Sequence, residues 1–280
     1  MNVPNASLPP TGEPTHDALR ERLAAVRARI DAAARACGRD PAEVGLLAVS
    51  KTFDADAVLA LADCGQHAFG ENYLQEALPK IASCLLRLGA RTPGRSGSAA
   101  GRPQADRTSL QASLQTSLEW HFIGPIQSNK TRAIAEQFDW VHSVERDKVA
   151  RRLSEQRPAS MAPLQVCVQV DVSGESTKSG CTPDEAIGLA HAVAALPGLQ
   201  LRGVMAIPAP TDDPALQRAQ FARVRAVFER MRADRLPVDT LSMGMSDDLE
   251  AAIREGATIV RVGTALFGAR PARTADSTAP

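Results

Sequence analysis

The 280-residue chain has no excess charge of either sign, no long apolar run and no clustered cysteines, and each absence excludes a class of function. Lys plus Arg and Asp plus Glu number 32 each, so the overall charge indicates neither a nucleic acid nor an acidic surface as partner. Residues 1–17 lack the apolar core of a signal peptide, and no run reaches the length of a membrane span. We therefore expect a cytoplasmic protein that binds neither nucleic acid nor membrane.

Cysteine and tyrosine are the scarce residue types whose positions matter most. The five cysteines are scattered without a C-x-x-C pair, which argues against a zinc ribbon or a disulfide framework and indicates reduced thiols. No metal site is expected. The single tyrosine is Tyr73, a fact that bears on catalysis below.

What the sequence does contain is a regular alternation of short apolar strands and amphipathic helices. The predicted strands are 44–49, 67–69, 120–123, 140–142, 164–170, 201–205, 240–241 and 259–262. After an N-terminal helix with periodic apolar residues from Leu19 to Ala34, the predicted helices are 55–64, 72–88, 128–138, 146–156, 183–195, 216–233 and 247–255. This pattern predicts an α/β fold with a single-domain (β/α)₈ TIM barrel. An open doubly wound sheet is the alternative, but no G-x-G-x-x-G follows the first strand.

Three segments do not fit this alternation. Residues 1–16 form a polar lead, predicted to be disordered, and residues 271–280 form a similar tail. Residues 91–117 are rich in Gly, Ser, Thr, Pro, Arg, Gln and Ala, and cannot bury enough apolar surface to offset the entropy lost on ordering. We expect a flexible insert there, within one barrel domain spanning 17–270.

In such a barrel, the residues at the C-terminal ends of the strands converge on one mouth. Lys51 ends the first strand, and alternation puts it on the same face as Leu47 and Val49. Such a lysine either reaches solvent at the rim or is a buried amine held for chemistry. Asn72 follows the second strand. We interpret the histidines at 121, 142 and 191 as hydrogen-bonded structural residues rather than ligands.

The segments after strands seven and eight offer donors for an anion. Loops at these positions often bind phosphate in this fold. Gly263 permits close backbone approach, while Ser246 and Thr264 carry hydroxyl groups. The competing interpretation is that Ser246 or Asp247 only caps a helix, with Glu250 completing a capping box.

A phosphate site facing a strand-end lysine suggests pyridoxal 5′-phosphate as the ligand. The aldehyde of this cofactor needs a neutral amine, and burial of a lysine disfavours the ammonium form. Arg261 would lie on the same face of the last strand as Ile259 and Gly263, where it could reach the pyridine nitrogen. The alternative for Arg261 is an ion pair with a neighbouring carboxylate.

Six stretches together resemble the pyridoxal phosphate homeostasis protein family: Ala48–Thr52, Phe69–Tyr73, Trp120–Lys130, Met205–Pro208, Leu241–Asp248 and Val260–Thr264. The resemblance covers residues 17–270 apart from the insert. It implies a barrel like the N-terminal domain of alanine racemase, with the cofactor held as a Schiff base on Lys51. It also implies phosphate contacts at Ser246, Gly263 and Thr264, Arg261 near the pyridine nitrogen, and Asn72 lining the pocket.

The resemblance further implies a carrier that buffers pyridoxal phosphate or delivers it to apo-enzymes, without established catalysis, and we expect this carrier to be a monomer. The alternatives are a fold-type III racemase or decarboxylase, and a cofactor-free Schiff-base lyase that uses Lys51. Related racemases take a tyrosine from an additional β-domain, for which this chain has no room, and Tyr73 lies too early to replace it. The chain also departs from the family: Phe53-Asp54 stands where many relatives have a second lysine, although Lys130 and Lys178 are expected near the mouth.

Overall fold

The computed structural model describes residues 15–91, 118–173 and 179–268. The predicted tail lies outside these residues, as do Lys178 and nearly all of the predicted lead and insert. At the two boundaries, helix α1 (His16–Ala36) and helix α3 (Leu74–Arg91) each include one residue that was assigned to a disordered segment. Thr15 caps α1 by accepting a hydrogen bond from the backbone N–H of Ala18.

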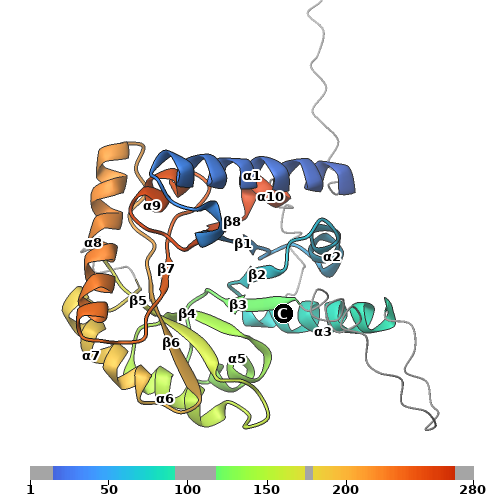
Figure 1. Ribbon diagram of the computed structural model, residues 1–280. Helices are drawn as coiled ribbons and strands as arrows, with labels where there is room; N and C mark the ends of the chain where they lie inside the picture. Colours follow the sequence, from blue (N-terminus) through green and yellow to red (C-terminus); the bar gives the residue numbers. More distant parts are fainter. Residues whose placement is uncertain (1–14, 92–117, 174–178, 269–280) are drawn as a thin grey trace, which may run out of the picture.

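Eight parallel strands pair in sequence order and close into a barrel, which confirms the predicted fold (Figure 1). The strands are β1 (Gly45–Val49), β2 (Ala68–Glu71), β3 (Glu119–Phe122), β4 (Trp140–Val144), β5 (Leu164–Gln169), β6 (Leu199–Met205), β7 (Thr240–Ser242) and β8 (Ile259–Val262). Their ends differ from the predicted ends by at most two residues. The remaining helices are α2 (Ala55–Asp63), α5 (Thr131–Gln137), α6 (Asp147–Gln156), α7 (Pro183–Ala194), α8 (Pro214–Ala233), α9 (Leu249–Arg254) and α10 (Thr264–Phe267), with a 3₁₀ turn η1 (Pro41–Glu43).

Three predicted helices begin two or three residues later than expected, at the mouth of the barrel. The helix predicted from residue 128 starts at Thr131. The helix predicted from residue 72 starts at Leu74, and the helix predicted from residue 247 starts at Leu249. Asn72 and Ser246 therefore lie in the segments between strand and helix, where their side chains are not committed to a helical face.

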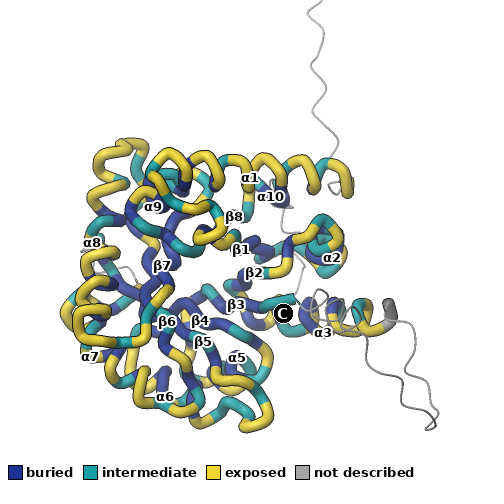
Figure 2. Tube along the Cα trace, viewed as in Figure 1, coloured by how far each residue is buried: buried dark blue, intermediate teal, exposed yellow. Residues whose placement is uncertain are grey.

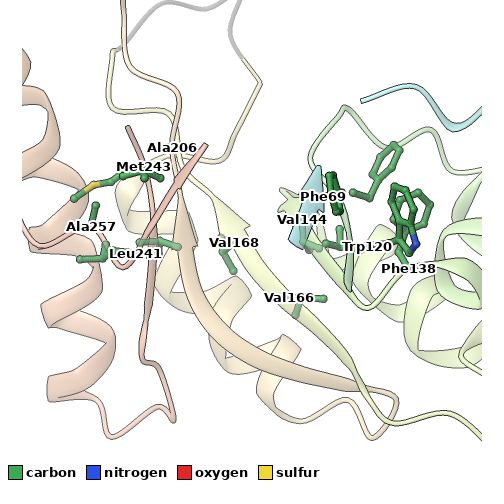
Figure 3. Close-up of a cluster of buried hydrophobic side chains, with 14 of the residues drawn as sticks. Phe69, Trp120, Phe138, Val144, Val166, Val168, Ala206, Leu241, Met243 and Ala257 are labelled. Atoms are coloured by element: carbon green, nitrogen blue, oxygen red, sulfur yellow. The ribbon is translucent and has the colours of Figure 1, made fainter. Parts of the chain in front are cut away.

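The main apolar core lies between the strands and the surrounding helices (Figure 2). Figure 3 shows part of this layer, in which Phe69 and Trp120 pack with their ring centroids 5.8 Å apart. Full burial of one such side chain stabilises the fold by about 1.5–3 kcal/mol. The inside of the barrel is different, because its small apolar cluster of Trp140, Cys167 and Met205 adjoins buried polar side chains.

Candidate functional site

Lys51 lies in the turn that follows β1 and is half-buried. Parallel pairing aligns Val49 of β1 with Gly70 of β2, and Leu47 of β1 with Arg261 of β8. The mouth next to Lys51 is therefore formed on one side by the segment after β2 and on the other by the segment after β8. Lys51 is neither an exposed rim residue nor a fully buried one.

A buried charge cluster holds the residue before Lys51. Lys80 of α3 donates from Nζ to the carbonyl oxygen of Ser50 at 2.8 Å and to Glu71 Oε1 at 2.6 Å. Ser50 Oγ donates to the same Glu71 oxygen at 2.6 Å. Burial raises the pKa of Glu71, and the nearby Lys80 acts in the opposite direction. These contacts fix the end of β1 from the outer side of the barrel.

Our sequence interpretation missed this cluster, although one signal was present. Lys80 falls in the apolar stripe of α3, between the buried residues Ala77, Ile81 and Cys84. A lysine in such a stripe is rarely buried unless it is paired, so its position points to a buried carboxylate. The identity of that carboxylate depends on how α3 packs against the barrel.

Apart from Glu71 Oε2 in the buried charge cluster, two oxygen atoms at the mouth are buried and have no hydrogen-bond partner among the described residues: Thr52 Oγ1 and Asn72 Oδ1. Thr52 adopts a left-handed backbone conformation with φ of 70°, which is uncommon for a β-branched residue. Gly124 packs directly on the Asn72 backbone, because an added Cβ would lie 2.0 Å from the Asn72 carbonyl oxygen. Unpaired buried oxygens are costly, so they mark a place where a polar ligand would be stabilised.

Arg261 is buried inside the barrel. From Nη1 it donates to the carbonyl oxygen of Ser242 at 2.6 Å and to Ser242 Oγ at 2.8 Å; from Nη2 it donates to the carbonyl oxygen of Ala206 at 2.9 Å. Burial lowers its pKa to about 10, with Asp248 acting in the opposite direction, so it is a cation at neutral pH. Its contacts are with backbone and hydroxyl oxygens rather than with a carboxylate, which was the alternative interpretation.

The capping explanation for Ser246 is wrong. Helix α9 begins at Leu249 without a side-chain cap, and Asp248 instead accepts a hydrogen bond from the Met245 N–H at 2.6 Å. Ser246 is half-buried, and its carbonyl oxygen accepts from Arg29 Nη2 of α1 at 2.9 Å. Arg29 also pairs with Glu250, which was the expected partner in a capping box. The Ser246 hydroxyl is therefore not needed at the start of α9.

Gly263 and Thr264 lie where β8 passes into α10. A Cβ at Gly263 would lie 3.2 Å from the carbonyl oxygen of Val49, so a side chain there would press on the end of β1. Thr264 is exposed and begins α10. Glycine thus lets β8 and β1 approach closely beside Lys51.

A separate groove of about 870 Å³ lies between α6 and α7, away from Lys51. Its charged lining is already paired, since Arg151 bonds Asp147 at 2.7 Å and Arg146 lies 3.2 Å from Glu145. Among the described residues, no group of three or more His, Cys, Asp or Glu is arranged to hold a metal ion. Within the same ranges, no helix combines the length and apolar character of a membrane span.

The family described as the alanine racemase N-terminal domain matches residues 22–271 of this chain. The pyridoxal phosphate homeostasis protein of Pseudomonas aeruginosa is 57% identical over 252 residues, which are 90% of this chain and 96% of that protein. The protein of the same name from Escherichia coli K12 is 46% identical and covers 90% of this chain and 97% of its own. The chain therefore belongs to the pyridoxal phosphate homeostasis protein family.

Solved structures support the same relationship. PipY of Synechococcus elongatus PCC7942, described with PLP bound, has a TM-score of 0.69 and 33% identity, covering 89% of this chain and 100% of PipY. Alanine racemase from Corynebacterium glutamicum has a TM-score of 0.56 at 18% identity, with 63% of that chain covered, and shows a shared fold alone.

Proposed function

We propose that this chain binds pyridoxal 5′-phosphate at the mouth of its barrel and takes part in the homeostasis of that cofactor. The observation that carries the proposal is the placement of the half-buried Lys51 beside two buried, unpartnered oxygens, with the Arg261 cation on the strand that pairs with β1. The residues at this end fit such a ligand, because Lys51 suits an aldehyde, the segments after β7 and β8 suit an anion, and Arg261 suits a ring nitrogen. The names of the relatives and the PLP in PipY support the same ligand.

Each predicted residue has a role in this proposal. Lys51 supplies the amine for covalent attachment of the aldehyde, and Asn72 lines the pocket beside it. Ser246, Gly263 and Thr264 hold the phosphate through hydroxyl groups and backbone N–H groups. When bound, the cofactor supplies an electrophilic carbon and a ring that can accept electrons.

We further propose that the protein stores or delivers the cofactor rather than catalysing a reaction with it. Arg261 donates hydrogen bonds and remains protonated, so it does not supply a proton to a ring nitrogen, and the ring is a weak electron sink. Tyr73, the single tyrosine, is 49% exposed just before α3 and is therefore not a sequestered acid–base group. In this proposal the protein is a cytoplasmic monomer, and it passes the cofactor to apo-enzymes.

The decisive experiment is an absorbance titration of the purified protein with pyridoxal phosphate, before and after reduction with borohydride. We expect a visible band that reduction removes, with the cofactor then fixed to Lys51. Lys51→Ala should abolish the band. Lys130→Ala, which removes another half-buried lysine from the same end of the barrel, is the matched control and should retain it.

A wild-type protein that stays colourless with added cofactor would overturn the proposal and leave the cofactor-free lyase. Proton exchange at the α-carbon of amino acids separates the carrier from the racemase. We expect exchange near background in the loaded protein. Rapid exchange that depends on Lys51 would instead support the enzyme.

A further inference from the structure

Five side chains form a continuous hydrogen-bond chain through the inside of the barrel. Arg261 Nη1 lies 2.8 Å from Ser242 Oγ, and Ser242 Oγ lies 2.8 Å from His142 Nδ1. His142 Nε2 lies 2.8 Å from His121 Nδ1, and His121 Nε2 lies 2.7 Å from Glu119 Oε1. The chain thus runs from β8 through β7 and β4 to β3, and ends at a carboxylate at the N-terminal end of the barrel.

The two ends of this chain face different surroundings. Arg261, Ser242, His142 and His121 are buried, whereas the side chain of Glu119 is 45% exposed. Strands of a parallel barrel all run in one direction, so Glu119, the first residue of β3, lies at the end opposite Lys51. The chain therefore connects solvent at one end of the barrel with the guanidinium near the other.

The direction that we propose for the chain starts from the fixed chemistry of its two ends, a guanidinium that can only donate and an ionised carboxylate that can only accept. Arginine can only donate, so Ser242 Oγ accepts from Arg261 and its own hydrogen is available to His142 Nδ1. His142 then carries its proton on Nε2 and donates to His121 Nδ1. His121 in turn carries its proton on Nε2 and donates to Glu119. Every donor in this arrangement points away from Arg261.

The surroundings of His142 and of Glu119 act on the charge of these two groups. Burial, with smaller contributions from His121 and Arg261, lowers the pKa of His142 well below its usual value. The hydrogen bond from His121 lowers the pKa of Glu119, which keeps the acceptor ionised. The Trp140 ring stacks on His121 at 5.3 Å and is itself covered by the Arg202 guanidinium at 4.7 Å.

We propose that Ser242, His142, His121 and Glu119 are positioning residues that act as one directed chain to hold the Arg261 guanidinium in the orientation required by the ligand's ring. The inference rests on the proposed binding of pyridoxal phosphate. Ser242 holds Nη1 through two oxygens, and Ala206 holds Nη2, so the plane of the guanidinium is fixed. The histidines determine which way the Ser242 hydroxyl points, and the carboxylate determines the tautomer of the histidines.

The first test measures the tautomers directly by ¹⁵N NMR of the imidazoles in the ligand-free protein. We expect His121 and His142 each to be protonated on Nε2 and unprotonated on Nδ1 at neutral pH. Protonation of Nδ1 on either ring would overturn the chain. Because no ligand is present, this result does not depend on the proposed function.

The second test compares Ser242→Ala with Cys167→Ala. Both variants remove one buried heavy atom from the inside of the same barrel, but only the first breaks the chain. We expect Ser242→Ala to weaken pyridoxal phosphate binding by three- to tenfold, to shift the absorbance maximum of the bound cofactor, and to change the ¹⁵N shift of His142 Nδ1. Cys167→Ala should leave the maximum and the Nδ1 shift as in the wild type.

Equal effects of the two variants on the absorbance maximum and the affinity would overturn the proposed role of the chain. If Ser242→Ala does not fold, the tautomers measured in the wild-type protein still show whether the chain has the proposed direction. A failure of the proposed function appears differently, as no visible band in any variant together with tautomers that still match the chain.

Discussion

The two sides of the barrel mouth are held by different physical means. On the β1 side, Lys51 follows a segment fixed by Glu71 and Lys80, whose side chains are 0% and 5% exposed. On the β7 side, Ser246 is held by Arg29, whose pair with Glu250 is 40% and 46% exposed. Charges out of contact with water interact strongly, whereas exposed charges are screened. The proposed attachment point is therefore held rigidly, and the proposed phosphate loop is held more weakly.

This comparison is tested most strongly by Lys80→Met, which leaves Glu71 buried without its cation. Removing one partner of a buried ion pair typically costs about 3–5 kcal/mol. We expect a loss of that size in the free energy of unfolding, measured with urea. Lys148→Met, at an exposed position on α6, is the control and should change stability by less than about 0.5 kcal/mol.

The double variant Lys80→Met with Glu71→Gln identifies the cause of that loss. It removes both charges, so much of the stability lost in the single variant should return. If the double variant is no more stable than Lys80→Met, the lysine contributes by packing rather than by its charge, and the contrast between the two sides of the mouth disappears.

On the other side of the mouth, Ser246→Ala tests the phosphate contact. A hydroxyl that donates to a charged phosphate oxygen stabilises binding by about 1.5–3 kcal/mol, so affinity for pyridoxal phosphate should fall by about tenfold or more. Affinity for pyridoxal, which lacks the phosphate, should change far less. Equilibrium titrations with both ligands give the ratio, and an unchanged ratio would reject Ser246 as a phosphate ligand.

The sequence predicted the architecture better than the contacts within it. The eight strands could be located because each is a short apolar run between polar turns, a local property. The starts of α3 and α9 were misplaced because the segments around Asn72 and Ser246 form turns instead; Asp248, for example, bonds the Met245 N–H. Local propensity does not distinguish such a turn from the first turn of a helix.

The charged and hydrogen-bonded partners could not be predicted, because they come from distant parts of the chain. Lys80 meets Ser50, and His142 meets Ser242, only after the barrel has closed. We expected His121 and His142 to be hydrogen-bonded structural residues, and the structure confirms their hydrogen bonds. The assignments of Lys51, Asn72, Ser246, Arg261, Gly263 and Thr264 as ligand-binding residues stay predictions for the experiments above.

A buried neutral histidine makes the inside of the barrel sensitive to acid. The folded state lowers the pKa of His142 well below 6.5. Below pH 6.5 the unfolded chain therefore binds a proton that the folded chain does not, and stability falls with decreasing pH by up to about 1.4 kcal/mol per unit. We expect this fall in stability between neutral pH and pH 5, measured by urea unfolding, to be absent in His142→Gln. It should be retained in His191→Gln, on the exposed face of α7. An equal pH dependence of the free energy of unfolding in wild type and His142→Gln would contradict the assignment of His142 as the source of the acid sensitivity.

The smallest effect is expected for Arg29→Ala, which removes the surface counterpart of Lys80. A half-exposed ion pair contributes about 1 kcal/mol or less, so the free energy of unfolding should fall by no more than that, and less at high salt. Arg29 also holds the Ser246 carbonyl oxygen, so the segment proposed to bind phosphate should become more mobile. The affinity for pyridoxal phosphate should therefore fall about two- to threefold, less than 1 kcal/mol. Arg35→Ala is the control, because Arg35 lies on the same helix and its Nη2 is 3.9 Å from Asp31 Oδ2. A loss from Arg29→Ala as large as that from Lys80→Met would show that the two sides of the mouth are held equally firmly.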